Sequence, residues 1–209
     1  MTVSQALREA TARLSATSDT ARLDAEVLMT HALGMSRSDM LLRAMDQNLP
    51  DVFEELETRS TQREPEAYIT GEQECFGRPF KVSPAVLIPR GDSEVIVEAA
   101  LEKAAQPRRV LDLGTGSGAL LVSVLAERPE AQGVGIDASQ KALEIAQANA
   151  CLLGDTGRVE FGHRNWRDHG WTEGLGTFDL ILANPPYVEE AALLEADVRE
   201  FEPSSALFA

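Results

Sequence analysis

The chain has 209 residues, of which 44% are hydrophobic and 25% are charged. This is the composition of a globular protein, and the length suits one large domain or one domain with a small appendage. The formal net charge of −15 disfavours non-specific binding to nucleic acids or anionic membranes, whose phosphates need cations opposite them. There is no apolar run of the roughly 18 residues that a membrane span needs, and the N-terminus lacks the layout of a signal peptide. The isolated cysteines, Cys75 and Cys151, suit the reducing cytoplasm and argue against a Cys-type zinc site.

Residues 1–65 predict a bundle of short helices. Thr2 to Gln5 fits a capping box before the first helix, and Gly34 is typical of the end of the second. A short third helix is expected at Met40–Leu42, and Pro50 is expected to open a fourth. The apolar faces are predicted to carry Leu23, Val27, Leu28 and His31 in the second helix and Val52, Phe53 and Leu56 in the fourth, with Glu54, Glu55 and Glu57 on a solvated face.

Residues 66–91 have aromatic residues, glycines and prolines at short spacing, which predicts a β-hairpin and an ordered linker. The expected strands are Glu74–Phe76 and Phe80–Val82. Cys75 is interpreted as a packing residue. Either Asp92 or Ser93 is expected to cap the helix that follows.

Residues 92–209 alternate between strand and helix. This pattern predicts an α/β fold with a doubly wound parallel sheet. The segment 166–176 is expected to be a surface loop. The predicted strands are Arg109–Leu113, Gly133–Asp137, Arg158–Gly162 and Phe178–Ala183, and the predicted helices between them are Gly118–Arg128 and Ser139–Leu153.

A glycine-rich turn, VLDLGTGSG at residues 110–118, follows the first of these strands. Gly114, Gly116 and Gly118 permit positive φ and close approach of a ligand to the backbone. Asp137 ends the next strand, where an acid can accept hydrogen bonds from the ribose hydroxyls of a nucleoside. The spacing G-x-G-x-G lacks the third interval of the dinucleotide fingerprint. The pattern therefore favours S-adenosylmethionine over a dinucleotide.

The fourth strand runs directly into Asn184-Pro185-Pro186-Tyr187. The prolines fix the backbone, so that the Asn184 side chain and nearby carbonyl groups become rigid hydrogen-bond acceptors. Such acceptors suit a planar NH₂ group, and Tyr187 offers a flat face on which a conjugated amide or base can stack. An amide or aromatic amine is a poor nucleophile, so this arrangement predicts catalysis of methyl transfer by positioning.

These motifs together resemble the PrmC/HemK family, bacterial methyltransferases that modify the glutamine of the Gly-Gly-Gln motif in peptide chain release factors. The matching stretches are residues 21–34, 63–90, 110–120, 133–139, 178–188 and 198–209. The resemblance implies a helical docking domain for the release factor at 1–65, a linker at 66–91, and a Rossmann-like class I S-adenosylmethionine-dependent methyltransferase domain at 92–209. It also implies a cytoplasmic, monomeric enzyme whose product is N5-methylglutamine.

Site residues are carried over by position. The resemblance assigns cofactor binding to Gly114, Thr115, Gly116, Ser117, Gly118, Asp137, Trp166 and Asn184, with Trp166 beside the adenine. It assigns the grip on the substrate glutamine to Asn184, Pro185, Pro186 and Tyr187, among which Asn184, Pro185 and Tyr187 are the expected catalytic residues.

The sequence departs from the family pattern in three places. Gly91 stands where the family usually has proline, and Asn165 stands where it usually has aspartate. The family also normally continues past this point with strands that complete a seven-stranded sheet. The sheet is therefore expected to be incomplete on its C-terminal side.

Three other functions fit parts of the sequence: a DNA adenine-N6 methyltransferase, a methyltransferase of a ribosomal-protein glutamine, and a binding module without catalysis. The charge of −15 and the lack of an evident target-recognition segment count against DNA. His163 and His169 are interpreted as solvated residues, His31 as a packing residue, and no metal site is expected.

Overall fold

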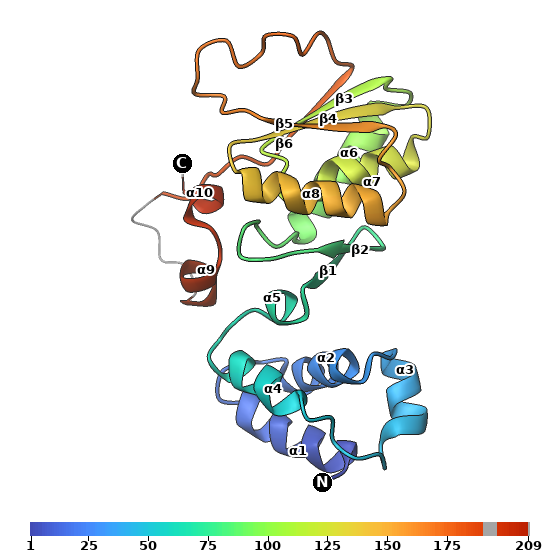
Figure 1. Ribbon diagram of the computed structural model, residues 1–209, viewed down its shortest axis with the longest axis vertical. Helices are drawn as coiled ribbons and strands as arrows, with labels where there is room; N and C mark the ends of the chain where they lie inside the picture. Colours follow the sequence, from blue (N-terminus) through green and yellow to red (C-terminus); the bar gives the residue numbers. More distant parts are fainter. Residues whose placement is uncertain (190–195, 209) are drawn as a thin grey trace. The chain divides into compact units, whose positions relative to one another are not determined.

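The computed structural model describes residues 1–189 and 196–208. The chain forms two compact units, coloured in chain order in Figure 1. The first contains Met1–Thr70 and α9 (Ala196–Phe201), and the second contains residues 71–189 and 202–208. This differs from the predicted division in two respects. The expected linker, residues 66–91, is divided between the units after Thr70, and α9 belongs to the first unit although it is remote in sequence.

The first unit consists of helices, as predicted. They are α1 (Val3–Leu14), α2 (Ala21–Leu33), α3 (Arg37–Asp39), the π-helical turn η1 (Met40–Ala44), α4 (Phe53–Thr61), α5 (Glu66–Thr70) and α9. Thr2 and Gln5 form the predicted capping box, and Gly34 ends α2 in the left-handed conformation, with φ of 62°. The largest fully buried side chains of this unit are Leu7, Leu14, Leu28, Met29, Met40 and Phe53.

The predicted apolar face of α2 is wrong in register. His31 is exposed and Leu23 is 50% exposed, whereas Ala25, Leu28 and Met29 are buried. Ala25, Leu28 and Met29 belong to the core that α2 shares with α1, so the side of α2 that packs on α1 is the buried one.

Helix α4 begins at Phe53 and not at Pro50, and Val52 is 44% exposed. Glu57 does not lie on a solvated face as predicted. Its side chain is 7% exposed, and Arg13 Nε donates to its Oε1 over 2.5 Å. A buried carboxylate needs such a partner, because desolvation would otherwise make its charge very costly. Glu54 and Glu55 are exposed, as predicted.

The second unit opens with an antiparallel hairpin of β1 (Glu72–Cys75) and β2 (Arg78–Lys81). The predicted strands lay one to two residues too far along the chain. Phe76 and Gly77, with φ of 51° and 68°, form the two-residue turn, which requires positive φ at both positions. Phe76 therefore belongs to the turn and not to a strand, and Cys75 is a buried packing residue.

The parallel sheet contains β3 (Arg109–Leu113), β4 (Gln132–Asp137), β5 (Val159–His163) and β6 (Leu180–Ala183) in the order β5-β4-β3-β6. Its bounds agree with the prediction to within two residues. Strand β6 begins late because Asp179 accepts hydrogen bonds from the amides of Arg108 and Arg109. The ring of Phe178 lies under the Arg109 guanidinium, whose carbon is 4.6 Å from the ring centre.

Helices α6 (Gly91–Lys103), α7 (Ala119–Glu127) and α8 (Gln140–Leu152) pack along the sheet. Helix α6 begins after Arg90, so neither Asp92 nor Ser93 is its N-cap, although the Arg90 amide donates to Ser93 Oγ over 3.4 Å. The crossovers β3–α7–β4 and β4–α8–β5 run in one direction, which places both helices on one face of the sheet. The loop from β5 to β6 arches over the other face (Figure 1).

Close packing between helix and sheet depends on glycine in β4. A Cβ atom on Gly133 would lie 2.8 Å from a side-chain carbon of Leu121 and 2.9 Å from one of Leu125. Glycine at this position lets α7 bury its apolar face directly on the strand. No helix within residues 1–189 and 196–208 is both long enough and apolar enough to cross a membrane.

Candidate functional site

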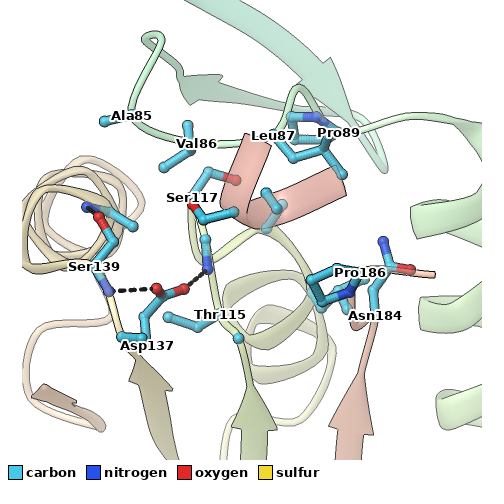
Figure 2. A pocket seen from close by; sticks show the side chains of 18 of the residues that line it. Ala85, Val86, Leu87, Pro89, Thr115, Ser117, Asp137, Ser139, Asn184 and Pro186 are labelled. Atoms are coloured by element: carbon cyan, nitrogen blue, oxygen red, sulfur yellow. Dashed lines mark hydrogen bonds between the residues drawn. The ribbon is translucent and has the colours of Figure 1, made fainter. Parts of the chain in front are cut away.

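A cavity of about 350 Å³ opens in the second unit at the carboxyl ends of β3, β4 and β6. This is the edge of an open parallel sheet where ligands bind. Figure 2 shows Asp137 and Ser139 on one side of the cavity, Asn184 and Pro186 on the other, and the segment from Ala85 to Pro89 across from the strand ends. The loop after β3 lies between these groups.

Four backbone N–H groups of the glycine loop have partners within the protein. The amides of Gly114 and Thr115 donate to the carbonyl of Ile136, each over 2.9 Å, and that of Gly118 donates to Thr115 over 2.8 Å. Gly116 donates to Asp137 Oδ2 over 2.9 Å. A phosphate site at a helix N-terminus needs free N–H groups. The loop therefore suits a nucleoside without a phosphate, in agreement with the prediction from the glycine spacing.

Asp137 connects the two turns that line the cavity. Its Oδ2 accepts from Gly116 and its Oδ1 accepts from the Ser139 amide over 2.8 Å, as the dashed lines in Figure 2 show. A carboxylate oxygen can accept more than one hydrogen bond. Asp137 can therefore hold the glycine loop and still accept from the hydroxyl groups of a ribose.

Asn184 and Pro186 line the cavity, whereas Pro185 and Tyr187 do not. Pro185 is exposed, and the Tyr187 side chain is 70% exposed. The extended turn places alternate residues on opposite sides. The structure thus brings Asn184 to the same cavity as the glycine loop and Asp137, and leaves the proposed stacking role of Tyr187 as a prediction.

Trp166 lies beside the glycine loop. A Cβ atom on Gly114 would be 3.2 Å from two ring carbons of Trp166. Among the other predicted cofactor residues, Thr115, Gly116 and Ser117 line the cavity, while Gly118 is buried behind it. Asn165 also lines the cavity, and its Oδ1 accepts from the Arg167 amide over 2.9 Å. Gly91, the other departure from the family pattern, begins α6.

Two polar residues that support the glycine loop were missed by the sequence analysis. Asn149 on α8 is fully buried, and its Nδ2 donates to the carbonyls of Ser117 and Lys81 over 2.8 and 2.9 Å. Its Oδ1 accepts from the Lys81 amide over 2.7 Å. A buried amide with three such bonds fixes the elements it joins, here β2 and the loop. A polar residue on an apolar helix face was the available signal.

The second is Asp112, a fully buried carboxyl on β3. Thr115 Oγ1 donates to its Oδ2 over 2.7 Å, and its Oδ1 has no hydrogen-bond partner among the described residues. Burial, and to a lesser extent the charge of Asp137, raises the pKa of Asp112 to about 7. The acid inside the apolar run VLDL was its signal in the sequence.

Neither histidine near the site shows the surroundings of a metal ligand. His163 and His169 are exposed, and His163 Nε2 lies 2.8 Å from the carbonyl oxygen of Ala138. Within the described part of the chain, no three His, Cys, Asp or Glu side chains are grouped so as to hold a metal ion.

Comparison with known proteins gives a direct match. A family model described as the PrmC N-terminal domain matches residues 5–71, and one described as the methyltransferase small domain matches residues 91–203. The chain is 42% identical to the release factor glutamine methyltransferase of Nitratidesulfovibrio vulgaris, over 96% of this chain and 70% of that relative. The chain belongs to the release factor glutamine methyltransferase family. Members of this family from Vibrio cholerae and Escherichia coli are 42% and 39% identical to it, over 100% and 97% of this chain and 74% and 73% of theirs.

Membership of the release factor glutamine methyltransferase family confirms the resemblance drawn from the motifs. The glycine loop, Asp137, Trp166 and Asn184 all fall within the part matched by the methyltransferase model. The cavity also has walls outside that part, formed by residues 85–89 and by Ser205, Ala206 and Phe208.

Proposed function

We propose that this protein transfers a methyl group from S-adenosylmethionine to the side-chain amide nitrogen of the glutamine in the Gly-Gly-Gln motif of release factors. The observation that carries the proposal is that one cavity joins Asp137 and the glycine loop to Asn184. This is the pairing of a nucleoside site with a rigid acceptor of an NH₂ group. Family membership supplies the reaction and the substrate, and the cytoplasm is the proposed compartment.

The cofactor would supply a methyl group on a positively charged sulfur, which is a good leaving group. Asp137 is proposed to accept from the ribose hydroxyls, while Trp166 and the Gly114–Gly118 loop enclose the nucleoside. A carboxylate at this place disfavours a 2′-phosphate through repulsion. The cavity lining also holds a single basic side chain among the described residues, Arg167. The donor set therefore fits a nucleoside better than a phosphorylated ligand.

Asn184 is proposed to orient the glutamine amide. Its side-chain oxygen and the adjacent backbone carbonyls can accept from both N–H bonds, which directs the nitrogen toward the methyl carbon. A C–N bond forms as the C–S bond breaks, and one amide proton leaves to solvent. No strong base has to act first, because the N-methylated cation is very acidic.

The test uses purified protein, S-adenosylmethionine with a labelled methyl group, and a bacterial release factor. Label is expected in the glutamine of the Gly-Gly-Gln peptide, as located by mass spectrometry, and a release factor with alanine at that position should take up none. Asn184→Ala should abolish transfer and leave most of the affinity for S-adenosylhomocysteine intact. Label in duplex DNA or in ribosomal protein alone, or transfer that survives Asn184→Ala, would refute the proposal.

A further inference from the structure

The end of the cavity near Asn184 has a wall that the catalytic motifs do not include. Ser205, Ala206 and Phe208 line the cavity from α10 (Ser204–Leu207) and the residue after it. Residues 85–89 line it from the loop before α6. Figure 2 shows Leu87 and Pro89 across the cavity from Asn184 and Pro186, with the short helix α10 between them.

Contacts at both ends hold the segment 202–208, named here the C-terminal wall. The Glu202 carboxylate forms an ion pair with Arg90, and its Oε2 accepts from the Ile88 amide over 3.4 Å. The Val188 amide donates to the carbonyl of Leu207 over 3.0 Å. The wall is thus attached at one end to the loop of residues 85–90 and at the other to the chain just after Tyr187.

The ion pair is asymmetric in its exposure to solvent. The Glu202 side chain is 2% exposed, whereas that of Arg90 is 51% exposed. A carboxylate this deeply buried is tolerated only when a cation and hydrogen-bond donors face it. Removing the charge of Arg90 would take away the cation that pairs with this buried carboxylate, which makes its burial less favourable. The ion pair therefore helps to hold the wall in place.

The lining at this end of the cavity is uncharged and mostly apolar. Leu87 and Pro89 lie toward Asn184 and Pro186 in Figure 2, and Ala206 and Phe208 complete the apolar lining with Ser205. The charged residues in the described lining are Asp137 and Arg167, which belong to the glycine-loop end with Ser139 and Trp166. Charged side chains would have to shed water here without a partner, whereas a neutral amide loses less on desolvation.

We propose that the C-terminal wall, clamped by the ion pair between Glu202 and Arg90, encloses the acceptor side chain and selects a neutral amide by excluding water and charge. This inference rests on the proposed function and deepens it. Glu202 and Arg90 are positioning residues, because they act through Ser205, Ala206 and Phe208. Both family-model matches leave out positions 85–90 and 204–208, so the wall is where selectivity can be added to a general methyltransferase site.

The test compares Arg90→Met, Arg90→Lys and Glu202→Gln with the matched control Glu127→Gln, which alters an ion pair with Arg78 in the same unit away from the cavity. Arg90→Met should raise KM for the release factor about tenfold or more and leave the dissociation constant of S-adenosylhomocysteine within about twofold. Arg90→Lys keeps the positive charge, so its KM should rise less than that of Arg90→Met. Glu127→Gln should change neither KM nor the dissociation constant.

A second readout needs no turnover. Amide hydrogen exchange in residues 204–208 should be at least about tenfold faster in Arg90→Met and in Glu202→Gln than in the wild type, while exchange in β3 and β4 stays slow. Unchanged exchange in residues 204–208 would overturn the inference, as would an equal loss of affinity for the release factor and for S-adenosylhomocysteine. If Arg90→Met does not fold, Glu202→Gln decides the question. A wild-type protein that transfers no methyl group would instead count against the proposed function, and the exchange result would still decide the clamp.

Discussion

Replacing Asp112 by asparagine should change how the stability of the second unit depends on pH. The Asp112 side chain has no exposed surface, and burial raises its pKa from 3.8 to about 7. The native state therefore favours the protonated acid, which Thr115 Oγ1 contacts over 2.7 Å. Asparagine has nearly the same shape and does not titrate, so the variant removes the proton equilibrium and keeps most of the packing.

The sign and size of the effect follow from linkage. Below pH 3.8, Asp112 is protonated in both states and has no effect on the free energy of unfolding. As the pH rises from 3.8 toward 7, the unfolded chain releases its proton while the native state keeps it. Each pH unit in this window lowers the free energy of unfolding by about 1.4 kcal/mol, which amounts to about 4 kcal/mol over the whole window. Above pH 7 both states are ionised and the loss is complete.

Urea unfolding followed by tryptophan fluorescence measures this effect. The two tryptophans, Trp166 and Trp171, lie in the second unit, so the signal reports that unit. The free energy of unfolding of Asp112→Asn, relative to that of the wild type, should rise by about 1.4 kcal/mol per pH unit between about pH 5 and about pH 7 and then level off. Glu127→Gln removes a carboxylate on the surface and serves as the control. A difference between wild type and Asp112→Asn that does not vary with pH would refute the reasoning.

Three further substitutions test the support of the cavity. Asp137→Asn replaces an acceptor of a backbone N–H by an NH₂ group and should weaken S-adenosylhomocysteine binding about tenfold to a hundredfold in calorimetry; an unchanged dissociation constant would contradict this. Asn149→Ala leaves buried groups of Lys81 and Ser117 unpaired and should lower the free energy of unfolding by about 1–3 kcal/mol, a loss that denaturant titration would detect and that a wild-type midpoint would exclude. Gly135→Ala places a Cβ 2.7 Å from a Phe161 ring carbon and should cost about 1–3 kcal/mol from overpacking, so a melting temperature equal to that of the wild type would count against the close contact.

The sequence predicted the sheet well because β3, β4 and β6 are short apolar runs that alternate with helices along the chain. Such runs have the same appearance whatever lies beside them, and β3 was placed without error. The helical unit was harder to predict. The buried side of α2 is set by its packing on α1, and the burial of Glu57 depends on Arg13 from another helix. Neither interaction is visible in the local pattern.

The site residues were also predicted where the local sequence pattern shows their position, and missed where it does not. Gly116, Asp137 and Asn184 were found because each ends or follows a strand at the binding edge, a position that sequence order reveals. Asn149 and Asp112 were missed because their importance comes from hydrogen bonds made after folding. Glu202 was missed for the same reason, since its partner Arg90 is remote along the chain.

The assignment of α9 to the first unit has a consequence for synthesis and for dissection of the chain. The helices up to Thr70 leave the ribosome early, but α9, with its buried Val198, follows only after the sheet has been made. The first unit therefore gains its last helix by a contact of long sequence separation, which slows folding. Cleavage between Thr70 and Gly71 would not release two whole units, because α9 of the first unit would stay on the fragment that carries the second. A fragment of the helical unit for binding studies would need α9 joined to it by a linker.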